Sequence, residues 1–95
     1  MFARITHYQV KPESVKKAKE LTETLKPKIM ALPGMKSFIN MVDDDGNGYV
    51  VSLVESREIS EGNAQAVQAL WANFQDHLVA PPTAEGFDVF AHWSA

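Results

Sequence analysis

The sequence predicts an α+β fold in which one antiparallel sheet is covered on one face by two helices. Three observations support this prediction. Two β-prone runs flank a stretch of turn-forming residues in the middle of the chain, as in a β-hairpin. One segment on each side of this hairpin repeats apolar residues at intervals of three and four, as amphipathic helices do. A further β-prone run lies near each end of the chain.

The first two expected elements are a strand and a long helix. Residues 2–10 are rich in Phe, Ile, Thr, Tyr and Val and contain no Gly or Pro, which is typical of a strand. Lys-Pro-Glu at 11–13 favours a helix start, because proline is tolerated at the first helical position and an acid suits that end. The apolar stripe of this helix is Val15, Ala18, Leu21, Leu25, Ile29 and Leu32. Pro27 lacks a backbone N–H, so we expect a kink or restart near Lys26, and Pro-Gly at 33–34 should end the helix.

The hairpin follows, with strands expected at 37–42 and 49–54. The loop between them contains Asp, Asn and Gly, which favour turns and tolerate positive φ. From Asp43 onward the loop also begins like a calcium-binding EF-hand loop. The twelfth position of such a loop should hold a bidentate acid, but here it is Val54. We therefore expect an acidic turn and no metal site.

The second half of the chain repeats the helix and strand patterns. Residues 56–63 are polar and are expected to form a turn or a loose helical start. A second helix is predicted over 64–78, with an apolar stripe of Val67, Leu70, Trp71, Phe74 and Leu78. Two prolines at 81–82 should follow its end, and a last strand is predicted over 87–93 after Gly86.

The order strand, helix, hairpin, helix, strand is that of a ferredoxin-like βαββαβ fold with a four-stranded antiparallel sheet. The strand at 49–54 has apolar residues in both of its alternating sets, so both sheet faces are expected to be covered. One helical layer covers only one face. We therefore predict that the other face packs against a second copy of the chain, which gives a homodimer.

Composition limits the possible functions. A length of 95 residues predicts a single domain over 1–95. The net charge of −3 provides no basic field for nucleic acid, and the absence of cysteine excludes disulfides, thiolate zinc sites and cysteine nucleophiles. No apolar run approaches the ~18 residues of a membrane span, and the N-terminus lacks the pattern of a signal peptide. A cytoplasmic protein without nucleic-acid or membrane partners is expected.

The chain resembles the dimeric α+β barrel superfamily and, within it, the small antibiotic-biosynthesis-monooxygenase-like (ABM-like) proteins. The resembling motifs are Val10-Lys11-Pro12-Glu13, Leu32-Pro33-Gly34-Met35, Ser52-Leu53-Val54-Glu55-Ser56 and Trp71-x-x-Phe74-x-x-His77. The resemblance implies two sheets packed back to back in a dimeric α+β barrel, with a small hydrophobic or aromatic ligand between sheet and helices. Some members are cofactor-independent oxygenases of quinols or polyketides.

Other members of this superfamily degrade haem, and they share an asparagine on the first strand, a tryptophan at the end of the third and a histidine on the second helix. The corresponding positions here hold Thr6 or His7, Val54 and His77. Only the histidine matches, so the resemblance does not imply haem degradation, and no cofactor is predicted.

His77 is the candidate catalytic residue. It borders the apolar stripe of the second helix, and an imidazole titrates near neutral pH, so it could serve as a general base. The alternative is a partly buried histidine with a purely structural hydrogen bond. His92 could join His7 and His77 in a three-histidine set, but no pair has ligand spacing, so no metal site is predicted.

The candidate ligand-binding residues are His7, Asn40, Trp71 and Phe74. His7 and Tyr8 lie on opposite faces of the first strand, so only one can face the helices, and the sequence leaves open which one. Asn40 is a polar residue in an apolar strand and could contact a ligand, the dimer seam or solvent. The two aromatic residues could frame a pocket or simply form core.

Two functions are consistent with these observations. The first is a cofactor-independent monooxygenase that acts on a small aromatic or quinol-like compound, with His77 transferring a proton. The second is a non-catalytic ligand-binding or interaction protein of the same fold. The first function requires a mostly apolar, water-poor pocket with His77 within hydrogen-bond reach of it.

Overall fold

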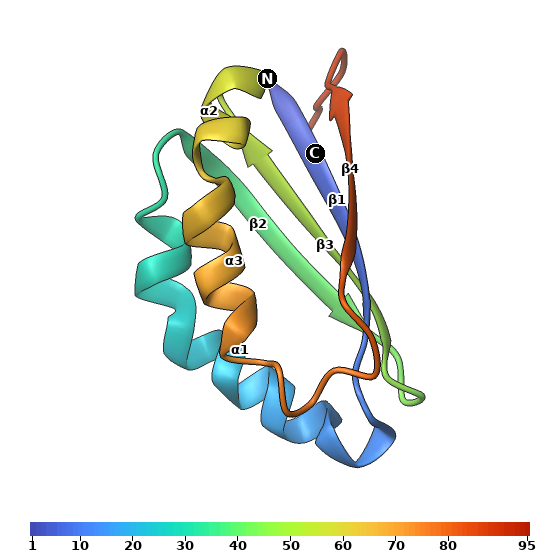
Figure 1. Ribbon diagram of the computed structural model, residues 1–95. Coiled ribbons are helices and arrows are strands. Elements are labelled where there is room, and N and C mark those ends of the chain that lie inside the picture. Colours follow the sequence, from blue (N-terminus) through green and yellow to red (C-terminus); the bar gives the residue numbers. More distant parts are fainter.

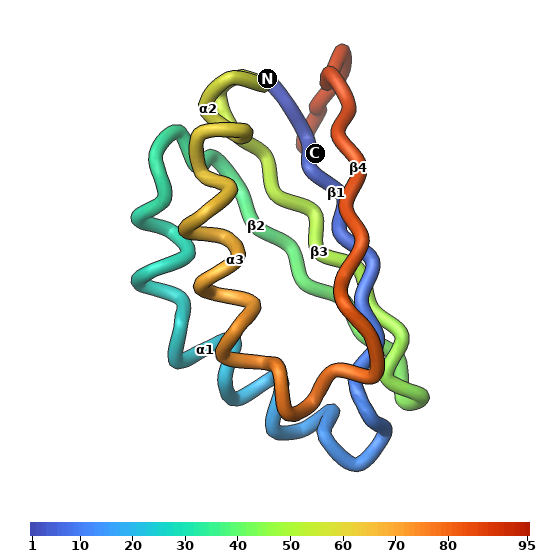
Figure 2. Tube along the Cα trace, viewed as in Figure 1, coloured from blue at the N-terminus to red at the C-terminus, as the bar shows by residue number.

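A computed structural model describes residues 1–95. Its elements are β1 (Phe2–Gln9), the 3-10 helix η1 (Pro12–Ser14), α1 (Val15–Met30), β2 (Met35–Val42), β3 (Asn47–Val54), α2 (Arg57–Gly62), α3 (Ala64–Ala72) and β4 (Thr83–Asp88). The strands form one antiparallel sheet in the order β2-β3-β1-β4, and α1 and α3 lie side by side over one face (Figures 1 and 2). The predicted ferredoxin-like α+β fold is confirmed.

The hairpin forms where it was predicted, and both of its strands are longer than expected. Asp43 organises the turn, because its Oδ1 accepts hydrogen bonds from the backbone N–H groups of Asp45 (3.0 Å) and Asn47 (2.9 Å). Gly46 has a φ of 93°, a conformation that glycine adopts without strain. Its carbonyl accepts a hydrogen bond from the N–H of Val10 at 2.8 Å, which ties the turn to the end of β1. The acidic turn therefore has a structural role: it closes the hairpin and connects it to the end of β1.

Helix α1 continues as a single helix across Pro27, so the predicted restart near Lys26 does not occur, while a kink at that point stays a prediction. Pro27 is exposed, and the carbonyl left without a backbone donor lies on a face that water can reach. The opposite face buries Ala18, Leu25 and Ile29 against the rest of the molecule.

Residues 56–63, expected to be only loosely structured, form a capped helix. The Ser56 Oγ accepts a hydrogen bond from the N–H of Ile59 at 3.2 Å and so caps α2. Asn63, between α2 and α3, is buried and donates from Nδ2 to the carbonyl of Pro33 at 3.0 Å. This bond joins the start of α3 to the loop between α1 and β2.

Helix α3 ends at Ala72, six residues before the predicted end at Leu78. Backbone pairing with the end of β1 explains the difference. The N–H of Lys11 donates to the carbonyl of His77 (2.9 Å), and the N–H of Val79 donates to the carbonyl of Gln9 (2.8 Å). The chain must leave the helix before residue 77 to make these bonds.

The last strand spans 83–88, so the predicted strand at 87–93 is wrong in position. β4 pairs with β1 from Phe2↔Asp88 to His7↔Thr83. β1 begins at Phe2, and beyond the Phe2↔Asp88 pair only the N–H of Val89 finds a partner there, the carbonyl of Met1 at 2.9 Å, so regular pairing ends at Asp88. The aromatic residues that suggested the later strand, Phe90 and Trp93, are exposed in the segment that follows β4.

The two sheet faces are both rich in apolar residues, as predicted. The face toward the helices carries Phe2, Tyr8 and Val50, which are buried. The outer face carries four large hydrophobic side chains that are about half exposed: Ile39, Met41, Tyr49 and Phe87. No element of this chain covers that face (Figure 1).

None of the helices has the length and apolar character required to cross a membrane.

Candidate functional site

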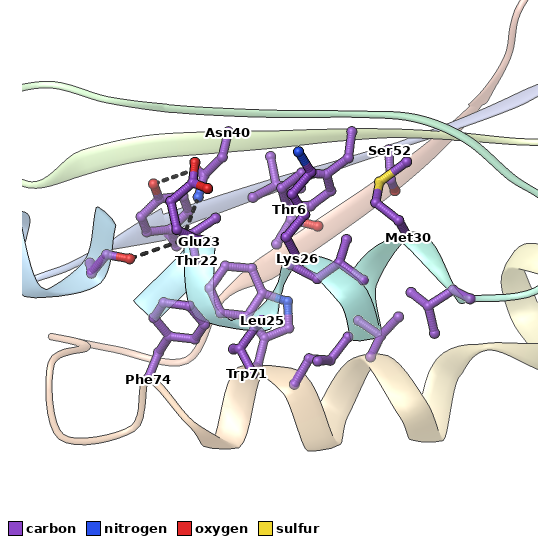
Figure 3. Close-up of a pocket in the computed structure, with 18 of the residues that line it drawn as sticks. Thr6, Thr22, Glu23, Leu25, Lys26, Met30, Asn40, Ser52, Trp71 and Phe74 are labelled. Atoms are coloured by element: carbon purple, nitrogen blue, oxygen red, sulfur yellow. Dashed lines mark hydrogen bonds between the residues drawn. The ribbon is translucent and has the colours of Figure 1, made fainter. Parts of the chain in front are cut away.

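A cavity of about 740 Å³ separates the sheet from α1 and α3. Fifteen of its 23 lining residues are hydrophobic, and they come from the sheet and from both helices (Figure 3). A buried cluster of Tyr8, Val10, Ala18 and Val50, with Phe38, Val42, Trp71 and Phe74 packed against it, fills the neighbouring space between sheet and helices. A cavity of this size and lining is typical of a binding site for a small, largely apolar molecule.

A chain of hydrogen bonds crosses one wall of the cavity (Figure 3). The Tyr8 hydroxyl donates to Asn40 Oδ1 at 2.6 Å, and Asn40 Nδ2 donates to Thr22 Oγ1 at 3.3 Å. The Thr22 hydroxyl in turn donates to the carbonyl of Ala18 at 2.9 Å. These bonds link β1, β2 and α1 and fix the orientation of the Asn40 amide.

Burial raises the pKa of the Tyr8 hydroxyl above its usual value, and the hydrogen bond to Asn40 opposes part of this effect. The phenol is therefore neutral at neutral pH. It donates its single proton to Asn40, so its oxygen remains free to accept a hydrogen bond. Asn40 uses one N–H on Thr22 and has a second N–H left.

Aromatic rings form the wall beside this hydrogen-bonded chain. The Trp71 ring lies 5.4 Å from that of Tyr8, and the Phe74 ring lies 5.7 Å from that of Trp71 (centroid distances), both in tilted arrangements. A flat ligand ring would therefore find aromatic surface next to a hydrogen-bonding pair.

The charged lining of the cavity is mostly positive although the chain as a whole has a net charge of −3. Arg4 from β1 and two lysines of α1, Lys19 and Lys26, line it, against a single carboxylate, Glu23. The cavity thus has apolar walls, a neutral hydrogen-bonding pair and an excess of cations.

The chain shares this architecture with several solved structures. A protein of unknown function from Nitrosomonas europaea superposes with a TM-score of 0.82 at 17% identity over 99% of this chain and 93% of that one. A monooxygenase from Streptomyces coelicolor in complex with the ligand nanaomycin D gives 0.78 at 20% identity over 99% and 91%. An antibiotic biosynthesis monooxygenase gives 0.76 at 19% identity over 96% and 100%.

The chain has an ABM-like fold. The resemblance predicted from the sequence motifs is confirmed at this level, because the structural agreement extends over nearly the whole chain. No protein-family model matches the sequence. No curated protein matches it either. Identities of 20% or lower establish the shared fold and leave the activity of this chain to be argued from its own residues.

Within this ABM-like fold, His77 does not line the cavity. Because α3 ends at Ala72, His77 belongs to the turn that follows and is not part of the helical stripe. Its Nδ1 lies 3.0 Å from Ser14 Oγ, so the ring ties this turn to the start of α1. The geometric condition for a catalytic His77 is therefore not met, and the structural alternative describes its position.

His7 also lies outside the cavity. It is exposed on the outer sheet face, where its ring lies 5.0 Å from that of Tyr49. Tyr8 faces the helices instead, which resolves the alternative that the sequence left open and corrects the choice of His7. His92 lies in the segment after β4 and does not line the cavity. No three His, Asp or Glu side chains gather in a way that could hold a metal ion.

The other three predicted ligand-binding residues, Asn40, Trp71 and Phe74, do line the cavity. Sequence reasoning missed Thr22 and Arg4 as cavity residues. The signal that could have identified Arg4 is alternation, since it shares a strand face with the buried Phe2 and Tyr8. A charged residue in that set indicates a polar requirement on the helix side of the sheet.

Proposed function

We propose that this chain binds a small aromatic or quinol-like compound in the cavity between sheet and helices and acts on it as a cofactor-independent monooxygenase. The Tyr8–Asn40 pair is the observation that carries this proposal. Its free acceptor on Tyr8 and free donor on Asn40 match the hydroxyl and carbonyl groups of a hydroxylated aromatic or quinol-like ring. The ligand-bound monooxygenase of the same fold supports it.

The substrate itself can supply the electrons in such a reaction. A ring carbon that carries two hydrogens takes one oxygen atom of O2 and becomes a carbonyl, while the second oxygen atom leaves with both hydrogens as water. The contribution of the protein is to orient the ring oxygen and to exclude water around the reacting carbon. The aromatic wall of Trp71 and Phe74 and the apolar lining serve the second purpose.

Oxygen consumption with anthrone as substrate tests this proposal. We expect the protein to accelerate uptake over buffer and Tyr8→Phe to lower kcat/KM by about 100-fold, because a positioned proton-transferring or orienting group contributes roughly 10²–10⁴-fold. His77→Ala is the matched control, since His77 lies outside the cavity, and it should retain the parent rate. Equal rates for Tyr8→Phe and the parent would rule out the proposed role of Tyr8.

The second candidate function is non-catalytic ligand binding. The absence of histidine from the cavity lining favours it, because Glu23 is the only conventional base there and it is exposed. Saturable binding of hydroxylated aromatic compounds without oxygen uptake would select this function over the monooxygenase.

We also propose that a second copy of the chain covers the outer sheet face. The four half-exposed hydrophobic side chains of that face support a homodimer, because an apolar patch of this kind is unusual on a monomer. A cytoplasmic location, and the lack of nucleic-acid or membrane partners, stay predictions.

A further inference from the structure

We propose that the cavity contains an anion subsite at Arg4 that selects ligands carrying an aromatic carboxylate. This inference rests on the binding role proposed above and adds the chemical class of the ligand. The observation behind it is an unpaired cation: the Arg4 Nε is buried and has no hydrogen-bond partner.

No acidic side chain neutralises Arg4. The two ion pairs of the chain are Lys36–Glu55 (3.4 Å) and Arg57–Asp88 (3.9 Å). Asp88 is the acid that could pair with Arg4. It lies on the same sheet face, two residues beyond Gly86, the residue of β4 that pairs with Arg4. It is instead within ion-pair distance of Arg57.

The guanidinium of an arginine keeps its positive charge in proteins, so the missing partner cannot be compensated by neutralisation. Buried polar groups in proteins are almost always paired, and a buried donor without a partner lowers stability. A guanidinium that lines a ligand-sized cavity and has no ion pair within the chain is therefore suited to bind an anionic ligand.

The surroundings of Arg4 fit an oxyanion. Ser52 on β3 lies directly opposite Arg4, and Thr6 is the next residue on the same face of β1, so both strand neighbours of Arg4 on this face carry hydroxyl groups. All three residues line the cavity. On the β4 side Arg4 faces Gly86, whose missing side chain leaves space that the Phe2 ring occupies. Arg4 thus has hydroxyl-bearing neighbours on β1 and β3 and a glycine opposite it on β4.

A carboxylate suits this site because the planar guanidinium can hold it through two parallel hydrogen bonds. Arg4 and Tyr8 are four residues apart on β1, which places their Cα atoms about 13 Å apart. A fused aromatic ring with a carboxylate at one end and a hydroxyl at the other can reach toward both. Its ring would lie against the apolar lining between them.

Calorimetric titration of two matched ligands tests the proposal. 6-Hydroxy-2-naphthoate carries the carboxylate, and 6-hydroxy-2-naphthamide replaces it with a neutral group of nearly the same shape. We expect the parent protein to bind the naphthoate at least tenfold more tightly than the naphthamide. Arg4→Met should weaken naphthoate binding by about 30-fold, the lower end for truncating one partner of a buried charge pair, and change naphthamide binding by less than about twofold.

Two control variants test whether Arg4 alone is responsible. Arg57→Met removes a cation that lies over the Phe2 ring and is not in the cavity lining, so it should leave both affinities unchanged. Lys26→Met removes a lysine that does line the cavity but is exposed, and it should lower the naphthoate preference only a few-fold. Arg4→Lys keeps the charge without the planar fork and should retain part of the preference, which provides a second measurement if Arg4→Met folds poorly.

The possible outcomes separate this inference from the proposed function. If the parent binds both ligands equally, or if Arg4→Met retains the naphthoate preference, the anion subsite is refuted while ligand binding stands. If neither ligand binds, the proposed function fails together with the subsite. A naphthoate preference lost in Lys26→Met but kept in Arg4→Met would assign the anion to α1 and overturn the role of Arg4.

Discussion

Removing the Tyr8 hydroxyl is the most direct test of the hydrogen-bonded chain in the cavity wall. Tyr8→Phe keeps the ring and its contact with Trp71 at 5.4 Å but deletes the donor to Asn40 Oδ1 at 2.6 Å. A typical intramolecular hydrogen bond contributes about 0.5–1.5 kcal/mol to stability. Asn40 is exposed enough for water to replace the lost donor, so we expect a loss of about 1 kcal/mol or slightly less.

Urea unfolding at neutral pH measures this change. With a slope of about 1–3 kcal/mol per molar urea for a small domain, the midpoint should fall by roughly 0.5 M and the slope should stay constant. Tyr49→Phe is the matched control, because the chain's other tyrosine is half exposed on the outer face, and it should change stability by less than about 0.5 kcal/mol.

A double-mutant cycle that combines Tyr8→Phe with Asn40→Ala measures the interaction free energy between the two side chains. We expect a coupling free energy of about 0.5–1 kcal/mol between Tyr8 and Asn40. A coupling of zero, or a Tyr8→Phe protein as stable as the parent, would refute the view that this hydrogen bond orders the cavity wall.

Three further predictions follow from the same structure. The folded-state pKa of Tyr8 is raised above its unfolded value, so the contribution of Tyr8 to stability is fully present below about pH 10 and is lost as pH rises through the higher folded pKa. In urea titrations at alkaline pH, the difference in unfolding free energy between the parent and Tyr8→Phe should therefore shrink. A difference that grows would contradict the raised pKa. Gly46→Ala should lose at least about 2 kcal/mol in urea unfolding, since alanine is strained at a φ of 93° and its Cβ would collide with the Val10 carbonyl; Gly62→Ala, whose Cβ would meet no atom within 4 Å, is the control and should not destabilise. In light scattering at micromolar concentration we expect a dimer that Met41→Lys converts to a monomer, because a charge would replace an apolar side chain on the outer sheet face; a monodisperse monomer for the parent would contradict the dimer.

The candidate site was only partly predictable from the sequence. Asn40, Trp71 and Phe74 were identified because a polar residue in an apolar strand and aromatic residues at helical spacing are visible in the order of residues alone. The two histidines were chosen for their chemistry, and the fold places both outside the cavity. His77 is not part of the helical stripe, because residues 77–79 form backbone hydrogen bonds with the end of β1. These segments are about 70 residues apart, so no local sequence pattern predicts the interaction.

The sequence by itself determined the elements whose signals are local. The acidic turn of the hairpin depends on residues within a few positions of one another, and the apolar stripe of α1 depends on spacing within one helix. The presence of apolar residues in both alternating sets of β3 was likewise readable from the chain.

Only the tertiary structure decided the features that depend on pairing between distant segments. The bounds of β4 follow from where β1 begins, and the choice of Tyr8 over His7 follows from which face of β1 receives the helices. The same choice places Arg4 in the cavity lining with its Nε buried and without an acidic partner, because Asp88, the acid nearest to it on that face, is within ion-pair distance of Arg57. Local spacing determines which residues share a face of a strand or helix, but long-range packing determines which other segments contact that face.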